Sequence, residues 1–404
     1  VVLNVSESNV YQDAITANMA YSTTTSATDL RPLVPTSVTY QWAPRFNKRF
    51  ATTLTTDYRI NPYLDVGLVT ITAAIREQVG TLVHTSNYFE LPLQTALAAE
   101  LCQRSGMQQA FFCNSGTESI EAAIKLARKW GSQKGITTPV IIVTEGAFHG
   151  RTMGALSLTG QESKRAPFRP LLKDIKHVPF GDIDAMRKAV TKKTAMVIIE
   201  PIMGEAGVIV PPADYLQQLR QLCDKNGSLL VIDAVQTGMG RTGDWFGYEY
   251  SGITPDVITL AKGLGGGLPL GAMIALGKAS ELFQPGDHGS TFGGNPVTTA
   301  AGLAAIEFIE SKGILNKVKK QGAHLIQELA LIPGVKEVRG AGLLIGIELE
   351  SLKASEISDA MREAGVLVNA ANATTIRIAP ALVVSDAQIT KFISIFKKVI
   401  ADAK

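Results

Sequence analysis

The chain has 404 residues, which at ~150 residues per domain is enough for two or three domains with a sizeable core. Its 46% hydrophobic and 19% charged residues are ordinary for a globular protein. The net charge of +3 comes from 39 basic and 36 acidic residues spread along the chain. No basic stripe or tail therefore favours nucleic acid or an anionic membrane as a partner.

The three cysteines, Cys102, Cys113 and Cys223, are widely spaced and form no CxxC pair. This spacing favours neither a disulfide framework nor a metal site, and it fits a reducing, cytoplasmic compartment. No apolar run approaches the ~18 residues of a membrane span, and the N-terminus lacks the layout of a signal peptide. The first thirty residues are rich in Ser and Thr, which leaves an organellar transit segment as an alternative, although three acidic residues count against it.

Residues 1–60 contain scattered Pro and Thr without a clear period, so we expect an irregular arm that contributes to a smaller domain. From about residue 109 to 274, short apolar runs alternate with helical patterns, which is typical of βαβ units and a mostly parallel sheet. The runs are "QAFFC", "VIIVTE", "MVIIEP", "LLVIDAV", "DVITLAK" and "AMIALG". We therefore predict a large domain over residues 61–290.

The pattern changes after about residue 296. A helix through "NPVTTAAGLAAIEFIES" is followed by extended segments at "KEVRGAGLLIGIELE" and "TTIRIAPAL". The last helix opens with the capping residues Ser385 and Asp386 and carries apolar residues at helical spacing. These features predict a smaller α+β domain over residues 291–404.

Ligands of open parallel sheets bind outside the carboxyl ends of the strands, so the residues that end each apolar run are the first candidates for a site. The first run ends in "CNSGTES", where Ser115 and Glu118 have the spacing of a capping box. Gly116 lets a ligand approach the backbone, and the start of a helix suits a phosphate. Taken alone, this motif is more often an ordinary capped helix.

The second run ends in "EGAFHGRT". Phe148 can stack on a flat ring, and the forked guanidinium of Arg151 suits a carboxylate. His149 could act as an acid or base, but a lone loop histidine more often packs or makes a hydrogen bond. We assign His149 no catalytic role.

Charged residues end the next three runs: Glu200, Asp233 and Lys262. A carboxylate directly after four apolar residues stays ionised only if a cation or several donors face it, so Asp233 implies a positive partner. A helix cap or a surface ion pair is the alternative for either acid. A lysine beside glycine is usually solvated, but at a crowded strand end desolvation lowers its pKa and supplies the neutral amine that forms a Schiff base.

The joint occurrence of a phosphate-type helix start, a stacking aromatic, a buried acid and a terminal lysine decides between these readings. Pyridoxal 5'-phosphate has a phosphate, a flat ring, a pyridine nitrogen that must stay protonated, and an aldehyde that an amine captures. The strand ends therefore predict a pyridoxal-phosphate site.

With these residues identified, the sequence resembles the class III (ornithine/acetylornithine-type) aminotransferases of the fold-type I pyridoxal-phosphate enzymes. The resemblance runs from "HTSN" at 84–87 through the C-terminal helix. Its motifs are "FFCNSGTES", "EGAFHGRT", "DAVQTGMGRTG", "TLAKGLGGGLPLGA" and "HGSTFGGNP". The family's fold implies an α/β protein in which the large domain holds a mostly parallel seven-stranded sheet and the small domain is α+β.

The resemblance also implies roles for the candidate residues. Lys262 would be the Schiff-base lysine and the acid/base that moves the substrate's proton, and Asp233 would pair with the pyridinium nitrogen. The further cofactor contacts that it implies are Ser115, Gly116, Thr117, Phe148, Gln236 and Thr291. Thr291 would reach the phosphate from the partner subunit, so the resemblance implies a homodimer.

For the substrate, the resemblance implies that Arg151 binds the carboxylate distant from the reacting amine and that Arg377 binds the α-carboxylate of glutamate or 2-oxoglutarate. Glu200 would pair with Arg377 when a terminal amine occupies the site. One pocket would then accept two differently charged substrates in a ping-pong cycle.

"HGSTFGGNP" and "VLVNAANATTIRIAPAL" are most similar to the family members of arginine biosynthesis that move the terminal amine of N2-acetylornithine to 2-oxoglutarate. Members acting on ornithine, succinylornithine, 4-aminobutyrate or a lysine-pathway amine share nearly all the motifs and stay alternatives. Less favoured are an aminomutase or decarboxylase and a non-catalytic binding protein.

The sequence departs from the family pattern between "YLDV" at 63–66 and "AAIREQ" at 73–78. A glycine-isoleucine-alanine-valine-like segment and a Gly-His-x-His-Pro motif are expected there, and neither is present. Met203 stands where glutamine is common, and Ala234 where glutamate is common. Neither substitution removes a predicted cofactor contact, and an altered substrate preference and no effect at all are both open for them.

Overall fold

The computed structural model describes residues 16–20, 37–42, 52–56 and 66–403. The chain forms two compact units, residues 1–66 and 67–404. In the first, three strands pair in an antiparallel sheet: β1 (Thr16–Ala20), β2 (Ser37–Trp42) and β3 (Thr52–Thr56). These strands occupy part of the region for which the sequence predicts an irregular arm, and the rest of that region lies outside the described residues. The predicted domain boundaries stay predictions.

A seven-stranded sheet forms the centre of the second unit, with strand order β4-β10-β9-β8-β7-β5-β6. Only β10 runs antiparallel to its neighbours, so the predicted mostly parallel α/β sheet is confirmed. Its strands are β4 (Gln109–Cys113), β5 (Val140–Thr144), β6 (Ile175–Val178), β7 (Thr194–Ile199), β8 (Leu229–Asp233), β9 (Val257–Leu260) and β10 (Gly271–Ala275). Six of them coincide with the predicted apolar runs, and β6 is the one that sequence analysis missed.

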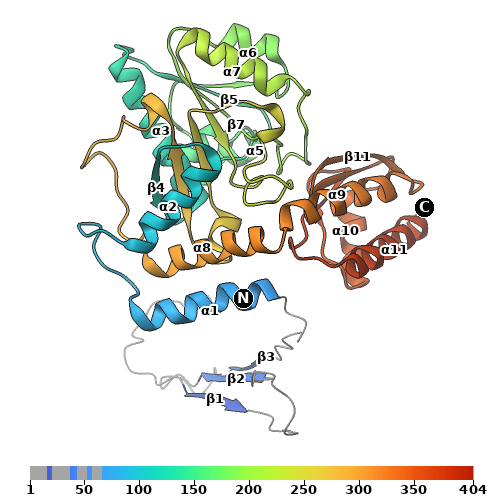
Figure 1. Cartoon of the computed structure of the whole chain (residues 1–404). Helices are drawn as coiled ribbons and strands as arrows, with labels where there is room; N and C mark the ends of the chain where they lie inside the picture. Colours follow the sequence, from blue (N-terminus) through green and yellow to red (C-terminus); the bar gives the residue numbers. More distant parts are fainter. Residues whose placement is uncertain (1–15, 21–36, 43–51, 57–65, 404) are drawn as a thin grey trace. The chain divides into compact units, whose positions relative to one another are not determined.

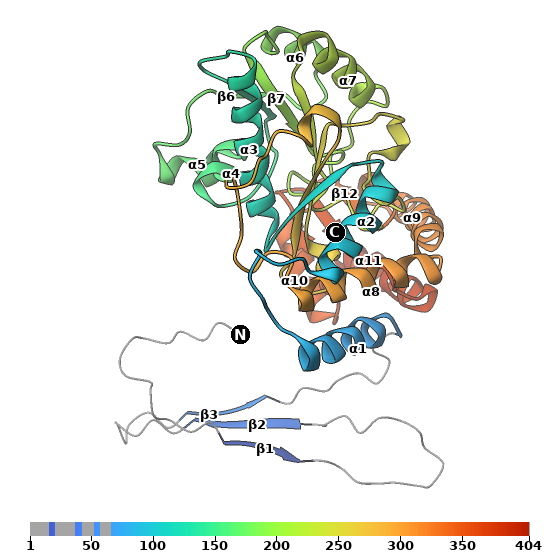
Figure 2. The same cartoon turned by 60° about the vertical axis from the view of Figure 1, so that its left-hand side comes forward.

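Helices cover both faces of this sheet. α3 (Gly116–Gln133) packs on one face and α7 (Tyr215–Asn226) on the other (Figure 2). Along β5, Ile141 belongs to the apolar cluster under α3 and Ile142 to the cluster under α7. Because both faces are buried, the central strands are continuous apolar runs, and this explains why the sequence predicts them well.

A smaller antiparallel sheet follows, with strand order β11-β12-β14-β13. Its strands are β11 (Val335–Ala341), β12 (Leu344–Leu349), β13 (Asn369–Ala370) and β14 (Thr375–Ile378). Three helices gather around it in Figure 1: α9 (Ile314–Ala330), α10 (Ala354–Glu363) and α11 (Asp386–Asp402). Ser385 caps α11 in a capping box with Gln388, as its predicted capping role requires.

The remaining helices are α1 (Val66–Thr81), α2 (Pro92–Ser105), α4 (Met153–Leu158), α5 (Glu162–Arg165), α6 (Ile183–Ala189) and α8 (Pro296–Ser311). Asn295 caps α8 by accepting hydrogen bonds from two backbone N–H groups of its first turn. In the described part of the chain, no helix combines the length and the apolar character needed to cross a membrane.

Candidate active site

A cavity of about 660 Å³ opens where the parallel strands of the large sheet end. Its size is in the range of small-molecule sites, and its position is the one expected for an open α/β sheet. Nine of the predicted site residues line it: Ser115, Gly116, Thr117, Phe148, Arg151, Glu200, Asp233, Gln236 and Lys262. The structure thus brings together side chains from five strand ends. Thr291 and Arg377 do not line the cavity.

The start of α3 forms one end of the cavity. Ser115 accepts a hydrogen bond from the backbone N–H of Glu118 at 3.3 Å, but the Glu118 carboxylate reaches the N–H of Asn114 at 2.5 Å, so the predicted capping box forms only in part. Within the described residues, the N–H groups of Gly116 and Thr117 have no hydrogen-bond acceptor. Free N–H groups at a helix start make a binding site for an anion such as phosphate.

Phe148 follows β5 and forms part of the cavity wall. Its backbone N–H donates to Glu200 Oε1 at 2.9 Å. The Arg151 guanidinium lies 5.6 Å from the centroid of the Phe148 ring and the Lys164 ammonium 4.8 Å from it. Lys164 was not among the predicted residues, and it adds a second cation beside the aromatic ring.

Asp233, at the end of β8, pairs with the buried imidazole of His149. Its Oδ2 lies 2.7 Å from Nδ1 of His149, and its Oδ1 accepts the N–H of Val235 at 3.0 Å. Burial opposes protonation of His149, but the hydrogen bond to Asp233 and the charges of Asp233 and Glu200 outweigh it and raise the pKa of His149. His149, which sequence analysis set aside, therefore orients Asp233. The available signal was its place at a strand end beside the other candidates.

Glu200, at the end of β7, is only 5% exposed. Its two oxygens accept hydrogen bonds from the N–H groups of Phe148, at 2.9 Å, and Gly204, at 3.2 Å. Burial, and then the negative charge of Asp233, raise the pKa of Glu200 to about 7, against the opposing effect of His149. Glu200 therefore titrates near neutral pH.

Lys262 begins a short 3-10 helix, Lys262–Gly265, directly after β9, and it has a positive φ of 48°. A left-handed conformation is uncommon for a residue other than glycine, and such conformations cluster at functional sites. The Lys262 side chain lines the cavity and, within the described part of the chain, makes no hydrogen bond or ion pair. Burial lowers the pKa of Lys262, although nearby carboxylates oppose that shift. These are the conditions in which a lysine supplies a neutral amine.

The expected pair between Glu200 and Arg377 is not formed in the structure. Arg377, on β14, binds Glu205 Oε1 at 2.6 Å and the carbonyl of Gly204 at 3.0 Å. The Glu200 carboxylate is instead held by the backbone N–H groups of Phe148 and Gly204. Gln236 donates to the same Glu205 oxygen at 3.2 Å.

Glu205 is therefore a site residue that sequence analysis missed. Burial favours a higher pKa for Glu205, but the hydrogen bond and positive charge of Arg377 outweigh it and lower the pKa. Glu205 lines the cavity and stays ionised against its cation.

Thr291 lies in the loop before α8 and is exposed. Its neighbour Ser290 accepts a hydrogen bond from Asn114 Nδ2 at 3.2 Å, which ties this loop to the segment that precedes α3. Thr291 itself does not line this chain's own cavity.

Residues 69–400 match the family description "Aminotransferase class-III". The acetylornithine aminotransferase of Mycolicibacterium smegmatis is 50% identical over 334 residues, which are 82% of this chain and 84% of that protein. The acetylornithine aminotransferase of Streptomyces coelicolor is 50% identical over 324 residues, 79% of each chain. The chain belongs to the class-III aminotransferases.

A solved structure shows the same fold in another class-III enzyme. The ornithine aminotransferase of Toxoplasma gondii, with pyridoxal phosphate partly occupying its active site, matches with a TM-score of 0.80 at 28% identity. The match covers 83% of this chain and 81% of that one. Residues 1–68 lie outside the class-III match.

Class-III aminotransferases depend on pyridoxal phosphate, and the cavity of this chain fits that cofactor. The free N–H groups of Gly116 and Thr117 suit its phosphate, and the Asp233 carboxylate suits a protonated ring nitrogen. When bound, the cofactor supplies an electrophilic aldehyde and a ring that withdraws electrons from the reacting carbon. Lys262 and Phe148 lie in the same cavity, so the residues present are consistent with the cofactor.

Proposed function

We propose that the chain transfers the terminal amino group of N2-acetylornithine to 2-oxoglutarate, giving N-acetylglutamate 5-semialdehyde and glutamate, a reaction of arginine biosynthesis. The pair between Arg377 and Glu205 carries this proposal. Arg151 lines the same cavity and has no ion pair among the described residues. The resting site therefore offers one available arginine and one that is already neutralised.

This charge pattern fits the two substrates in turn. N2-acetylornithine has a single carboxylate, distant from its terminal amine, which Arg151 would bind while Arg377 stays neutralised by Glu205. Glutamate and 2-oxoglutarate carry a second carboxylate next to the reacting carbon. For them Glu205 would leave Arg377, which would then bind that carboxylate as a forked donor.

The other residues hold the cofactor and move the proton. Ser115 and the backbone of Gly116 and Thr117 would bind the phosphate, and Phe148 would stack on the ring. Asp233, held by His149 at 2.7 Å, would keep the ring nitrogen protonated. Lys262 would anchor the cofactor through its amine, and the released amine would then move the proton between the substrate carbon and the cofactor's C4' carbon. Gln236 would lie near the phenolic oxygen.

We propose a cytoplasmic homodimer in which Thr291 reaches the phosphate bound by the partner subunit. Thr291 is exposed and stands off this chain's own cavity. Large exposed apolar side chains occur in the same part of the sequence and in the segment before α2: Val83, Tyr88, Phe89 and Phe292. An apolar surface of this kind is typical of an interface. Sedimentation of the purified protein measures the oligomeric state, and a monomer at micromolar concentration would contradict the shared site.

A panel of amino donors tests the reaction. N2-acetylornithine, ornithine, succinylornithine and 4-aminobutyrate are each mixed with the cofactor-loaded enzyme, and the loss of the bound cofactor's visible absorbance is followed. We expect the highest kcat/KM for N2-acetylornithine, with glutamate formed from 2-oxoglutarate in equal amount. No turnover of N2-acetylornithine would refute the proposed substrate, and failure to form glutamate would point to an aminomutase or decarboxylase.

A further inference from the structure

Glu205 lies on a tight loop that the small sheet holds in place. In this loop, residues 203–209 (the Glu205 loop), Met203 and Ile209 exchange two backbone hydrogen bonds of 3.0 Å. Val208 is fully buried and has a φ of 56°. A positive φ is strained for a β-branched residue and persists only where surrounding contacts impose it.

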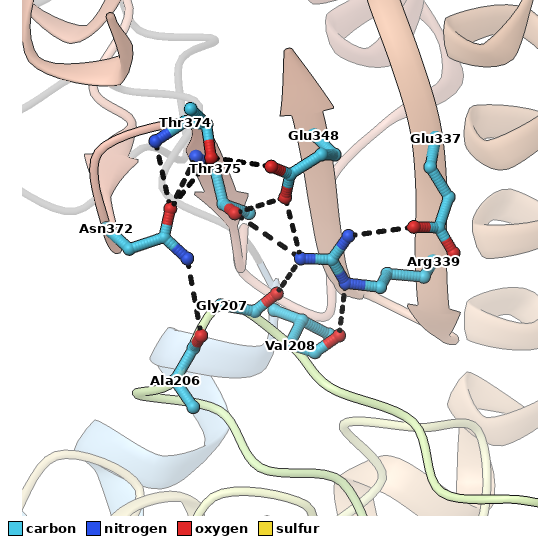
Figure 3. A network of polar contacts seen from close by, with 9 residues as sticks. All are labelled: Ala206, Gly207, Val208, Glu337, Arg339, Glu348, Asn372, Thr374 and Thr375. Atoms are coloured by element: carbon cyan, nitrogen blue, oxygen red, sulfur yellow. Dashed lines mark hydrogen bonds and ion pairs between the residues drawn. The ribbon is translucent and has the colours of Figure 1, made fainter. Parts of the chain in front are cut away.

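Arg339 of β11 provides those contacts (Figure 3). Its Nε donates to the carbonyl of Val208 at 3.1 Å, and its Nη2 donates to the carbonyl of Gly207 at 3.0 Å. One guanidinium therefore holds two consecutive carbonyls of the Glu205 loop, and one of them belongs to the strained residue. Asn372 adds a third, longer contact, from its Nδ2 to the carbonyl of Ala206 at 3.4 Å.

The side chain of Arg339 is itself oriented by a polar network in Figure 3. Glu348 of β12 accepts a hydrogen bond from Arg339 Nη2 at 3.0 Å and from the Thr375 hydroxyl at 2.6 Å. The Thr374 hydroxyl donates to the other Glu348 oxygen at 2.5 Å. Glu337 pairs with Arg339 Nη1 at 3.1 Å, although that carboxylate is 58% exposed. The guanidinium is thus fixed in one direction, toward the loop.

The register of the small sheet places Arg339 in one row with Arg377, the arginine that is proposed to bind the substrate carboxylate. Gly346 of β12 stands opposite Arg339 on one side and opposite Arg377 on the other. Residues opposite each other in an antiparallel sheet project on the same face. A Cβ on Gly346 would lie 2.7 Å from the carbonyl oxygen of Gly207, so the loop backbone lies directly over this glycine. The Glu205 loop is therefore held between two arginines of one row.

We propose that Arg339 is a positioning residue that sets the substrate preference of this site, an inference that rests on the proposed function. By fixing the backbone of residues 207 and 208, Arg339 holds the Glu205 carboxylate in range of Arg377. This raises the effective concentration of Glu205 against any substrate carboxylate that competes for the same guanidinium. The pair between Glu205 and Arg377 favours N2-acetylornithine, because this substrate needs Arg377 neutralised. Glutamate is disfavoured because it needs Arg377 free.

Arg339→Gln tests this proposal, with Arg362→Gln as the matched control. Arg362 lies on α10 in an exposed pair with Asp359 and does not contact the loop, so the control makes the same chemical change without touching the network. The two half-reactions are measured separately in single turnover, one with N2-acetylornithine and one with glutamate. In R339Q we expect the ratio of kcat/KM for the amine to kcat/KM for glutamate to fall about tenfold, the scale of one lost charge-assisted hydrogen bond. In R362Q the ratio should stay at the wild-type value.

Amide hydrogen exchange in the cofactor-free protein gives a second readout that requires no turnover. We expect exchange at residues 203–209 to rise about tenfold in R339Q while exchange in β8 is unchanged. Arg339→Lys, which keeps the charge but has a single nitrogen, should give intermediate values in both measurements. It is also the variant to use if R339Q does not fold.

Equal losses in both half-reactions, or unchanged exchange in the loop, would overturn the positioning role and leave Arg339 as a general stabilising residue. A different result refutes the proposed substrate, namely that the wild-type enzyme does not accept N2-acetylornithine. In that case the ratio is measured with the amine that the wild type does accept, and the exchange experiment stands unchanged.

Discussion

Replacement of Glu200 by glutamine should remove a pH-dependent destabilisation of the folded protein. Burial raises the pKa of Glu200 from 4.5 to about 7, so the folded chain holds a proton that the unfolded chain releases at lower pH. Stability from this group is therefore highest below pH 4.5 and falls as the pH rises toward about 7. A shift of this size corresponds to about 3 kcal/mol once the carboxylate is fully ionised.

Glutamine cannot ionise, so E200Q should escape this loss. Its amide oxygen can still accept the N–H of Phe148, but its NH2 group cannot accept the N–H of Gly204, so the variant loses one hydrogen bond at every pH. The lost hydrogen bond shifts the free energy of unfolding of E200Q by the same amount at every pH. Between about pH 5 and about pH 8.5 the difference between the two proteins should therefore change in favour of E200Q by up to about 3 kcal/mol.

Urea unfolding of the cofactor-free protein, repeated from about pH 5 to about pH 8.5, measures this difference as a function of pH. Groups whose pKa does not depend on Glu200 contribute equally to both proteins and cancel in the comparison, whereas His149, whose pKa the charge of Glu200 helps to raise, does not cancel. Glu145→Gln is the control, since Glu145 also follows a strand but is exposed. Parallel stability curves for wild type and E200Q would refute the proposed cause, because they would mean that burial at this strand end does not disfavour the charged form.

Three further predictions concern the same cavity. Lys262→Ala should abolish transamination and the visible absorbance of bound cofactor while leaving the unfolding midpoint within a few degrees of wild type; measurable turnover would exclude the anchoring role. His149→Asn should remove the imidazole that pairs with the buried Asp233 and destabilise the protein by about 3 kcal/mol in urea unfolding, together with weaker cofactor binding. Gly116→Ala places a Cβ 2.9 Å from Val235 Cγ1, so we expect a loss of about 1–3 kcal/mol and a higher dissociation constant for the cofactor, and unchanged binding would contradict the close approach at this helix start.

The sequence predicts the large sheet well where burial on both faces leaves a continuous apolar run. β6 is the exception: this edge strand has the sequence "IKHV", in which Lys176 is exposed and His177 half-buried, whereas the other edge strand, β4, keeps an apolar run that ends in buried residues. Edge strands do not need an apolar run, and the pattern that identifies the other six strands is absent in β6.

The rule that ligands bind at strand ends identifies the cavity residues whose positions the sheet fixes. It misses Glu205 because the sheet does not fix the position of that residue. Residues that directly follow a strand, such as Asp233 and Lys262, have positions fixed by the sheet, so their meeting can be predicted from the strand pattern alone. Glu205 follows β7 by several residues, and its place depends on the turn at Val208 and on the contacts of Arg339. Arg339 belongs to the small sheet and lies more than a hundred residues further along the chain.

The strand pattern alone does not predict which glutamate, Glu200 or Glu205, pairs with Arg377. Both glutamates lie in one short segment, and the strand rule favours Glu200 because it ends the apolar run. In the structure, the N–H groups around the strand end hold the Glu200 carboxylate, and burial makes this carboxylate costly to ionise. Glu200 is therefore not the residue that pairs with Arg377. A glutamate that must bind Arg377 and later release it needs the opposite surroundings, a lowered pKa and a partner that a substrate carboxylate can replace. The loop position of Glu205 provides both, so the proposed substrate exchange would depend on a residue beyond the end of the strand.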